Sequence, residues 1–262
     1  MLKKIRYWVL FISSYVNWFE MIAHRASGRK VKRVFLRNGL KILGRDSGSL
    51  SVVVDEIFLL KRYTPTFLNI NKGDIVVDIG AHVGVFSLMA ALCGASRVYS
   101  FEADINSVDM IRKNCRFNGL NNIFVRNLAI SNKRGRLKLF LAGEDGGNTL
   151  FKNAILARNK RFRMIKSVRL EDIFRMEKIK KIDFLKIDCE GSEGLIIGST
   201  PANVWKRICK ISMEYHDNVS PMLHDEMCKR LEANGFVTRR LDQGNGYGYL
   251  YAWRSTPPTR SQ

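Results

Sequence analysis

The sequence predicts an α/β protein with a doubly wound, mainly parallel sheet and an antiparallel closing strand. From residue 74 onward, short β-branched runs alternate with helical segments, which is the pattern of consecutive βαβ units. A glycine-containing turn follows the first run and opens a helix. The regular part ends in two runs joined by a Gly-rich turn, and this arrangement indicates an antiparallel closing pair.

The spacing of apolar residues places the individual elements. Asp104 is expected to cap one helix at its start, and Asn118-Gly119 is expected to end it. The run 52–60 predicts a further strand, followed by a short helical lead-in at 63–65. The main strands are expected at 75–78, 97–101, 123–127, 182–188 and 208–214, an extra one at 137–141, the closing pair at 236–240 and 247–252, and helices at 85–92, 104–118 and 222–233.

Length and composition indicate one ordinary folded domain with additions at its ends. The 262 residues are 46% hydrophobic and 26% charged, close to the average of soluble globular proteins. We divide them into an N-terminal basic and aromatic extension (1–50), a main folded domain (51–253) and a disordered tail (254–262). The five cysteines are odd in number and form no C-x-x-C motif, so free thiols in a reducing, cytoplasmic setting are expected.

The charge balance predicts attraction to polyanions. Against 24 acidic residues stand 44 Lys and Arg, a formal net charge of +20. Nucleic acid, anionic lipid and phosphorylated glycans all fit such a charge. Residues 152–166 contain six Lys or Arg and no acidic residue, and such a run is usually a solvated face. Its position before a main strand also makes it a candidate lid or acceptor contact.

The N-terminal segment supports two interpretations. Residues 7–19 are apolar and aromatic, yet the run is shorter than the ~20 residues of a membrane-spanning helix. Residues 1–33 contain eight Lys or Arg and one acidic residue, Glu20, which favours peripheral contact with the anionic inner face of a membrane. The near-helical spacing of Trp8, Phe11, Tyr15 and Trp18 equally permits a helix packed on the domain itself.

A candidate cofactor site follows the first main strand. Residues 78–84 form a D-x-G-x-x-x-G pattern, with Asp78, Gly80, Ala81 and Gly84 as candidate cofactor residues. Such a pattern arises by chance in roughly one chain in ten of this length. Glu102 strengthens it, because this acid ends the next strand 24 residues later, near the ~20 expected for an acid that binds ribose hydroxyls. The loop lacks the G-x-G-x-x-G spacing that favours a pyrophosphate, so S-adenosylmethionine is the expected cofactor.

Ionisable residues gather at the ends of the later strands. Asp188 ends one strand and Glu190 follows it, so both are expected to face the cofactor amine or acceptor hydroxyls, whereas Glu193 is expected to cap the next helix. His216 is the natural general base for a hydroxyl, although a lone histidine is often structural. Asp188, His216 and Glu214 end adjacent strands, and we also consider Mg²⁺ there.

These stretches, in this order, resemble the FkbM family of methyltransferases, which implies the class I methyltransferase fold. The resemblance further implies methylation of hydroxyls on sugars, glycolipids or polyketides. It departs from the family pattern at His82, where Asn is usual, at Ala103, where Pro is usual, and at Ser192, where Ala is usual. The residues that carry it are 76–81 with Gly84 and Ser87, Phe101-Glu102, Asn118, 170–172, 186–188 with Glu190-Gly191 and Glu193, and Glu214 with His216.

The expected function is therefore S-adenosylmethionine-dependent O-methylation of a sugar, glycan or glycolipid. An RNA methyltransferase is the first alternative, which the positive charge favours, but no RNA-binding module is visible in the sequence. The second alternative is a non-catalytic protein that binds anions or membranes on a methyltransferase scaffold. The intact acids Asp78, Glu102 and Asp188 argue against such a loss of activity.

Overall fold

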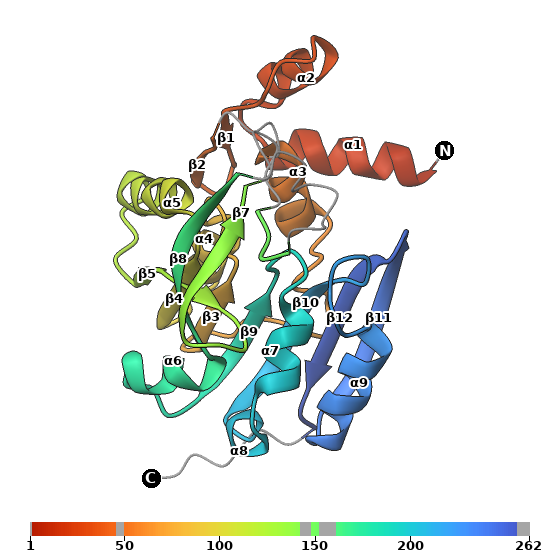
Figure 1. The fold of residues 1–262 in the computed structure, drawn as a ribbon. Helices are drawn as coiled ribbons and strands as arrows, with labels where there is room; N and C mark the ends of the chain where they lie inside the picture. Colours follow the sequence, from red (N-terminus) through yellow and green to blue (C-terminus); the bar gives the residue numbers. More distant parts are fainter. Residues whose placement is uncertain (1, 46–49, 142–147, 152–160, 256–262) are drawn as a thin grey trace.

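The computed structural model, which describes residues 2–45, 50–141, 148–151 and 161–255, confirms the predicted α/β sheet. Seven strands lie in the order β11-β12-β10-β9-β3-β4-β5 (Figure 1). The five from β10 to β5 run parallel, and β12 is antiparallel to both its neighbours. The strands are β3 (Ile75–Ile79), β4 (Arg97–Glu102), β5 (Ile123–Asn127), β9 (Ile182–Ile187), β10 (Ile208–His216), β11 (Val237–Gly244) and β12 (Tyr247–Trp253).

Both faces of the sheet are buried because successive residues of each strand point to opposite sides. In β3, Val76 packs into one hydrophobic cluster, and Val77 and Ile79 pack into a second one. The first cluster includes residues of α4 (Val85–Leu92) and α5 (Ile105–Phe117). The second includes residues of α6 (Leu170–Met176), α7 (Glu193–Ser199), α8 (Ala202–Trp205) and α9 (His224–Ala233). Near-continuous apolar strands are what such a doubly covered parallel sheet requires.

The boundaries of the predicted helices follow the expected signals. Asp104 caps α5, since its side chain accepts a hydrogen bond from the Asn106 N–H, and the helix ends at Phe117 with Asn118 as its C-cap. Helix α4 begins directly after Gly84, whose φ of +89° is the left-handed conformation that favours glycine. The sequence therefore predicted these elements to within one or two residues.

The strand predicted at 52–60 is wrong. These residues form α3 (Leu50–Val54), which continues into a π-helix, η1 (Asp55–Leu59). Leu50, Val54 and Ile57 are buried at helical spacing, and η1 packs against α4. Tertiary packing thus overrides the strand preference of the valines at 52–54. The helical lead-in expected at 63–65 is likewise absent, because these residues form bends, and Pro65 disfavours helix in the residue before it.

The N-terminal segment forms two helices, α1 (Leu2–Ser14) and α2 (Trp18–Ala26), followed by the hairpin β1 (Arg33–Phe35) and β2 (Lys41–Leu43). Phe11, Tyr15 and Met21 are fully buried in the same cluster as Val76. The segment therefore packs on the domain, as one of the two interpretations expected. Among the described residues, no helix is both long and apolar enough to cross a membrane.

A small three-stranded sheet lies beside the main one. It consists of β6 (Ala129–Ile130), β7 (Gly135–Phe140) and β8 (Phe162–Val168), with β8 in the middle. Strand β7 matches the extra strand predicted at 137–141, whereas β8 was not predicted and includes the end of the basic run. The remainder of that run, 152–160, and most of the expected tail, 256–262, lie outside the described residues. The five cysteines are free thiols, as expected.

Candidate active site

A cavity of about 270 Å³ opens at the carboxyl ends of β3, β4, β9 and β10. It lies between β3 and β9, the topological switch point of the sheet: β4 and β5 are added on one side of β3, and β9 and β10 on the other. Ligands bind at such switch points in open α/β sheets. Its size is near the lower end of small-molecule pockets. Side chains and backbone of the loop after β3, the end of β4, the segment after β9 and η1 form its wall.

The glycine loop after β3 is held against the neighbouring strand. Gly80 has a φ of +74°, and a Cβ built there would lie 1.6 Å from the Asp188 carbonyl oxygen. The Gly80 and Ala81 amides both donate to the Phe101 carbonyl, and the His82 amide donates to a Glu102 oxygen at 2.8 Å. These three N–H groups are therefore not free for a phosphate, which agrees with the expectation of a cofactor without one at this loop.

Behind the loop lies a buried ion pair. Lys186 Nζ is 3.1 Å from Asp78 Oδ1, 3.4 Å from Asp188 Oδ2 and 2.8 Å from the Gly80 carbonyl oxygen. Burial lowers the pKa of Lys186, but the two carboxylates outweigh burial and raise it above its usual value. The Ser87 hydroxyl donates to Asp78 at 2.6 Å. Asp78 and Gly84 do not line the cavity, so the structure gives them a role in positioning the loop, whereas Gly80 and Ala81 form the wall.

Glu102 reaches the cavity from the end of β4. Its two carboxylate oxygens accept hydrogen bonds from the His82 and Asp104 amides, each at 2.8 Å. Burial raises the pKa of Glu102 to about 7, although these hydrogen bonds partly offset that effect. Each oxygen retains a lone pair that can accept a hydrogen bond from a hydroxyl group. The position and chemistry of Glu102 thus fit the predicted ribose ligand.

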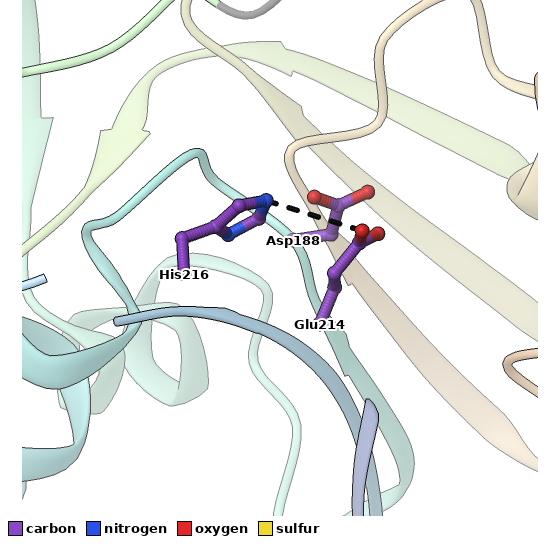
Figure 2. A group of neighbouring side chains, drawn as sticks. All are labelled: Asp188, Glu214 and His216. Atoms are coloured by element: carbon purple, nitrogen blue, oxygen red, sulfur yellow. Dashed lines mark ion pairs between the residues drawn. The ribbon is translucent and has the colours of Figure 1, made fainter. Parts of the chain in front are cut away.

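An acid–base cluster lies at the carboxyl ends of β9 and β10. The imidazole of His216 is 3.3 Å from Glu193 through Nδ1, and its Nε2 is 3.6 Å from Glu190 and 3.9 Å from Glu214. Figure 2 shows His216 directed at the carboxylates of Asp188 and Glu214. Glu190, Asp188 and Glu214 line the cavity, and His216 lies behind them. The structure therefore brings together Asp188, Glu190 and His216, the three residues predicted to be catalytic.

The charge state of the cluster differs from the sequence-based expectation. Burial lowers the pKa of His216, but Glu193, Glu190 and Asp188 outweigh burial and raise it to about 10. With this pKa the imidazole keeps its proton at neutral pH, which disfavours the predicted role of general base. Burial and the charge of Asp188 raise the pKa of Glu190 to about 7, where a carboxyl group readily exchanges protons.

Glu193 has a structural role, as expected. Its carboxylate is fully buried and accepts hydrogen bonds from the Cys189 amide at 2.9 Å and the Gly191 amide at 3.2 Å. It thereby fixes the turn that presents Glu190, which has a φ of +53°. The same carboxylate faces His216 Nδ1, so one side chain organises both the turn and the imidazole.

Tyr63 joins two of the acids and was not predicted. Its hydroxyl lies 2.8 Å from Asp188 Oδ2 and 2.6 Å from Glu214 Oε2. A hydroxyl has one proton, so it can donate to only one carboxylate, and the other must itself be protonated to share a hydrogen bond. Burial and Asp188 raise the pKa of Glu214 to about 8, which identifies Glu214 as the protonated partner.

Asp188, Glu214 and His216 also form a candidate metal group, since ligand atoms of the three lie within 4.8 Å of one another. Their present contacts do not suit Mg²⁺. The Lys186 ammonium and the Tyr63 hydroxyl occupy one oxygen of Asp188, and Tyr63 occupies one oxygen of Glu214. His216 offers a ring nitrogen where Mg²⁺ prefers oxygen. The expected Mg²⁺ therefore has no fitting ligand set here.

Comparison with known proteins finds one matching family model and several similar methyltransferases. The model of the methyltransferase FkbM domain matches residues 78–238. The 31-O-demethyl-FK506 methyltransferase FkbM of Streptomyces tacrolimicus is 24% identical over 238 residues, which cover 79% of this chain and 89% of that one. A ribosomal protein L11 methyltransferase of Caldanaerobacter subterraneus is 34% identical, but over only 28% of this chain and 24% of its own length.

A solved structure confirms the fold. The methyltransferase FkbM of Methylobacillus flagellatus superposes with a TM-score of 0.52 at 15% identity, over 79% of this chain. This chain spans about half of that protein, 54% of its length. The predicted class I methyltransferase fold is thus confirmed.

Proposed function

Because the chain belongs to the FkbM methyltransferase family and is an S-adenosylmethionine-dependent methyltransferase, we propose that it methylates a hydroxyl oxygen of a sugar, glycan or glycolipid. The observation that carries this proposal is the set of cavity-lining acids, Asp188, Glu190 and Glu214, beside a protonated His216. Carboxylates accept hydrogen bonds from hydroxyl groups and can remove one hydroxyl proton.

The cofactor would occupy the side of the cavity formed by the glycine loop. Glu102 would bind its ribose hydroxyls, and Gly80 and Ala81 would allow close approach of its amino-acid part. Asp188, whose pKa burial raises but Lys186 lowers below the usual value, supplies a negative charge for its cationic groups. When bound, this cofactor supplies a methyl group already activated by its sulfonium, so the protein needs mainly to align the acceptor and remove one proton.

Glu190 is the proposed proton acceptor. It is the most exposed of the acids around His216, with 36% of its side chain accessible, and it lines the cavity. The charged imidazole of His216, with Nε2 3.6 Å from Glu190 Oε2, would keep this carboxylate oriented by electrostatic attraction. As the hydroxyl oxygen takes up the methyl group, its proton passes to Glu190, and the imidazolium stabilises the cluster electrostatically. No step in this scheme uses Mg²⁺.

The charge of Asp188 argues against RNA as the acceptor. The pKa of this cavity-lining carboxyl lies below its usual value, so its negative charge would repel a phosphate group near the reacting atom. A non-catalytic scaffold is also disfavoured, since such a scaffold has no need to retain a buried cluster of raised-pKa acids.

The proposal is tested by incubating the protein with radiolabelled S-adenosylmethionine and cell fractions of lipid, glycan and RNA. We expect label in the lipid or glycan fraction, stable to base, as an ether is and a methyl ester is not. Label in the RNA fraction alone would favour the first alternative. Cofactor binding by calorimetry without label in any fraction would favour the scaffold.

A further inference from the structure

Helix α1 has two apolar sides, and only one of them packs on the protein. On the packed side, the Tyr7 and Tyr15 hydroxyls both donate to the Asp55 carboxylate of η1. Arg25 of α2 forms an ion pair with the same carboxylate at 2.8 Å. Phe11, between the tyrosines, is fully buried. These contacts hold α1 and α2 in one orientation relative to the catalytic domain.

The opposite side of α1 is apolar and exposed. The exposed surface, which we name the apolar stripe, consists of large side chains that are 41–72% accessible. A helix that is apolar all round is normally buried, and exposed apolar patches of this kind mark interaction sites. Figure 1 shows α1 and α2 at the top of the view, beside α3 and beyond the main sheet. The apolar stripe consists of Ile5, Trp8, Val9 and Ile12 of α1, and we include in it the exposed Val16, which follows α1, and Phe19 of α2.

The charge around the apolar stripe identifies the occupant. Residues 1–33, which include the apolar stripe, contain eight Lys or Arg and a single acidic residue, Glu20, and of the eight Arg25 is paired with Asp55. Glu20 is paired with Arg33 at 3.1 Å, while Arg6 and Arg29 are exposed. A second copy of a chain with a net charge of +20 would be repelled at this surface. A nucleic acid would neutralise the charge but offers no apolar interior for Trp8 and Phe19.

We propose that the apolar stripe docks on an anionic lipid bilayer, with α1 lying in the plane of the interface. The aliphatic side chains and Trp8 would enter the acyl boundary, and the basic side chains would contact acidic headgroups. This mode uses a short amphipathic helix and needs no spanning segment, which agrees with the lengths of α1 and α2.

Docking would bring the cavity close to the bilayer. Helix α1 contacts η1, and Glu56 and Ile57 of η1 line the cavity wall. An acceptor hydroxyl on a lipid headgroup would then be presented near the acid–base cluster. That last step rests on the proposed function, whereas the docking itself does not.

The test is cosedimentation with phosphatidylcholine vesicles, with and without phosphatidylglycerol, at physiological salt. The wild type is expected to bind the anionic vesicles at least about tenfold more tightly than the neutral ones. Val9→Asp with Ile12→Asp is expected to weaken this binding by at least about tenfold, because it removes two aliphatic contacts and adds two repelled charges.

The matched control is Val237→Asp with Leu241→Asp, which adds the same charge at two exposed aliphatic residues of β11, 43% and 39% accessible. Because its two new charges lie away from the apolar stripe, this variant should lose only the vesicle affinity that follows from a net charge lower by two, to within about twofold. All three proteins should bind S-adenosylmethionine equally by calorimetry, which separates this test from the proposed function. Docking is refuted if the wild type does not bind anionic vesicles or if both double variants bind them alike. It is also refuted if light scattering shows a wild-type dimer that Val9→Asp with Ile12→Asp converts to a monomer.

Discussion

The two sides of the cavity wall are built in different ways. The proposed cofactor side is a short segment of chain, residues 78–84 with Glu102, and backbone hydrogen bonds hold it in place. The acceptor side is assembled by side chains far apart in the sequence: Tyr63 reaches Asp188 and Glu214, 125 and 151 residues away. The first side is rigid and its motif is visible in the sequence. The second depends on packing and on shared protons, so it is where substrate preference can change without loss of cofactor binding.

The largest effect is expected on the rigid side. Gly80→Ala should destabilise the protein by more than about 4 kcal/mol or prevent folding, since the new Cβ would meet the Asp188 carbonyl oxygen at 1.6 Å. The control is Gly39→Ala, which has a φ of +93° but no atom within 4 Å of the new Cβ, so it measures backbone strain alone, about 1–2 kcal/mol. Urea denaturation gives the free energy of unfolding of each variant. Equal losses of this free energy in Gly80→Ala and Gly39→Ala would remove the argument for close packing at Gly80.

On the acceptor side, the two cavity acids should respond unequally. Glu190→Gln should lower kcat by about 100- to 10,000-fold, the usual contribution of a general base, with cofactor affinity retained. Glu214→Gln should stay within about tenfold of wild type, because a glutamine amide can donate to Tyr63 as the protonated carboxyl does. Initial rates with a labelled acceptor would decide, and the reverse order would transfer the base role to Glu214.

The ribose contact should have an intermediate effect. Glu102→Ala is expected to weaken S-adenosylmethionine binding by about 1.5–3 kcal/mol, the range for hydrogen bonds to a charged group. Calorimetric titration gives the affinity directly. A thermal melt is the necessary companion, because Glu102 also holds the His82 and Asp104 amides. Unchanged affinity in a folded variant would remove the ribose assignment.

The smallest effect concerns acid stability. Burial lowers the pKa of His82 from its ordinary 6.5 to about 4, so the unfolded chain binds a proton more readily between those values. The stability from neutral His82 is complete above pH ~6.5 and is lost as the pH falls toward 4. His82→Asn should therefore lose about 1–2 kcal/mol less than wild type between pH 7 and 4. Asparagine also tolerates the φ of +51° at this position. Denaturation curves of the wild type and the variant at pH 7 and pH 4 give the two losses of stability. Equal losses in the two proteins would contradict this prediction.

The sequence predicted what depends on local pattern. The βαβ rhythm gave the parallel strands, and the spacing of Asp78, Gly80 and Glu102 gave the cofactor side. Residues 52–60 were misassigned because their helical form depends on packing against α1 and α4, which local preference does not record. Glu56 lies in that stretch and Tyr63 follows it, so their place in the cavity could not be foreseen.

Protonation states were equally inaccessible to sequence reasoning. The position of His216 was predicted, but its charge depends on Glu193, whose buried carboxylate sits against it only in the folded protein. One overlooked signal was available: Lys186 lies near the end of a fully buried, mainly apolar strand, and a buried charge of this kind requires a partner.

The Asp55 carboxylate has a consequence for how the molecule melts. Tyr7, Tyr15 and Arg25 converge on this one buried side chain, immediately before the cavity-lining Glu56. The first 26 residues and the catalytic domain therefore share a single cooperative unit. Scanning calorimetry should show one heat-absorption peak for the whole chain, and Asp55→Ala should shift that entire peak to lower temperature without splitting off a separate transition for the two N-terminal helices.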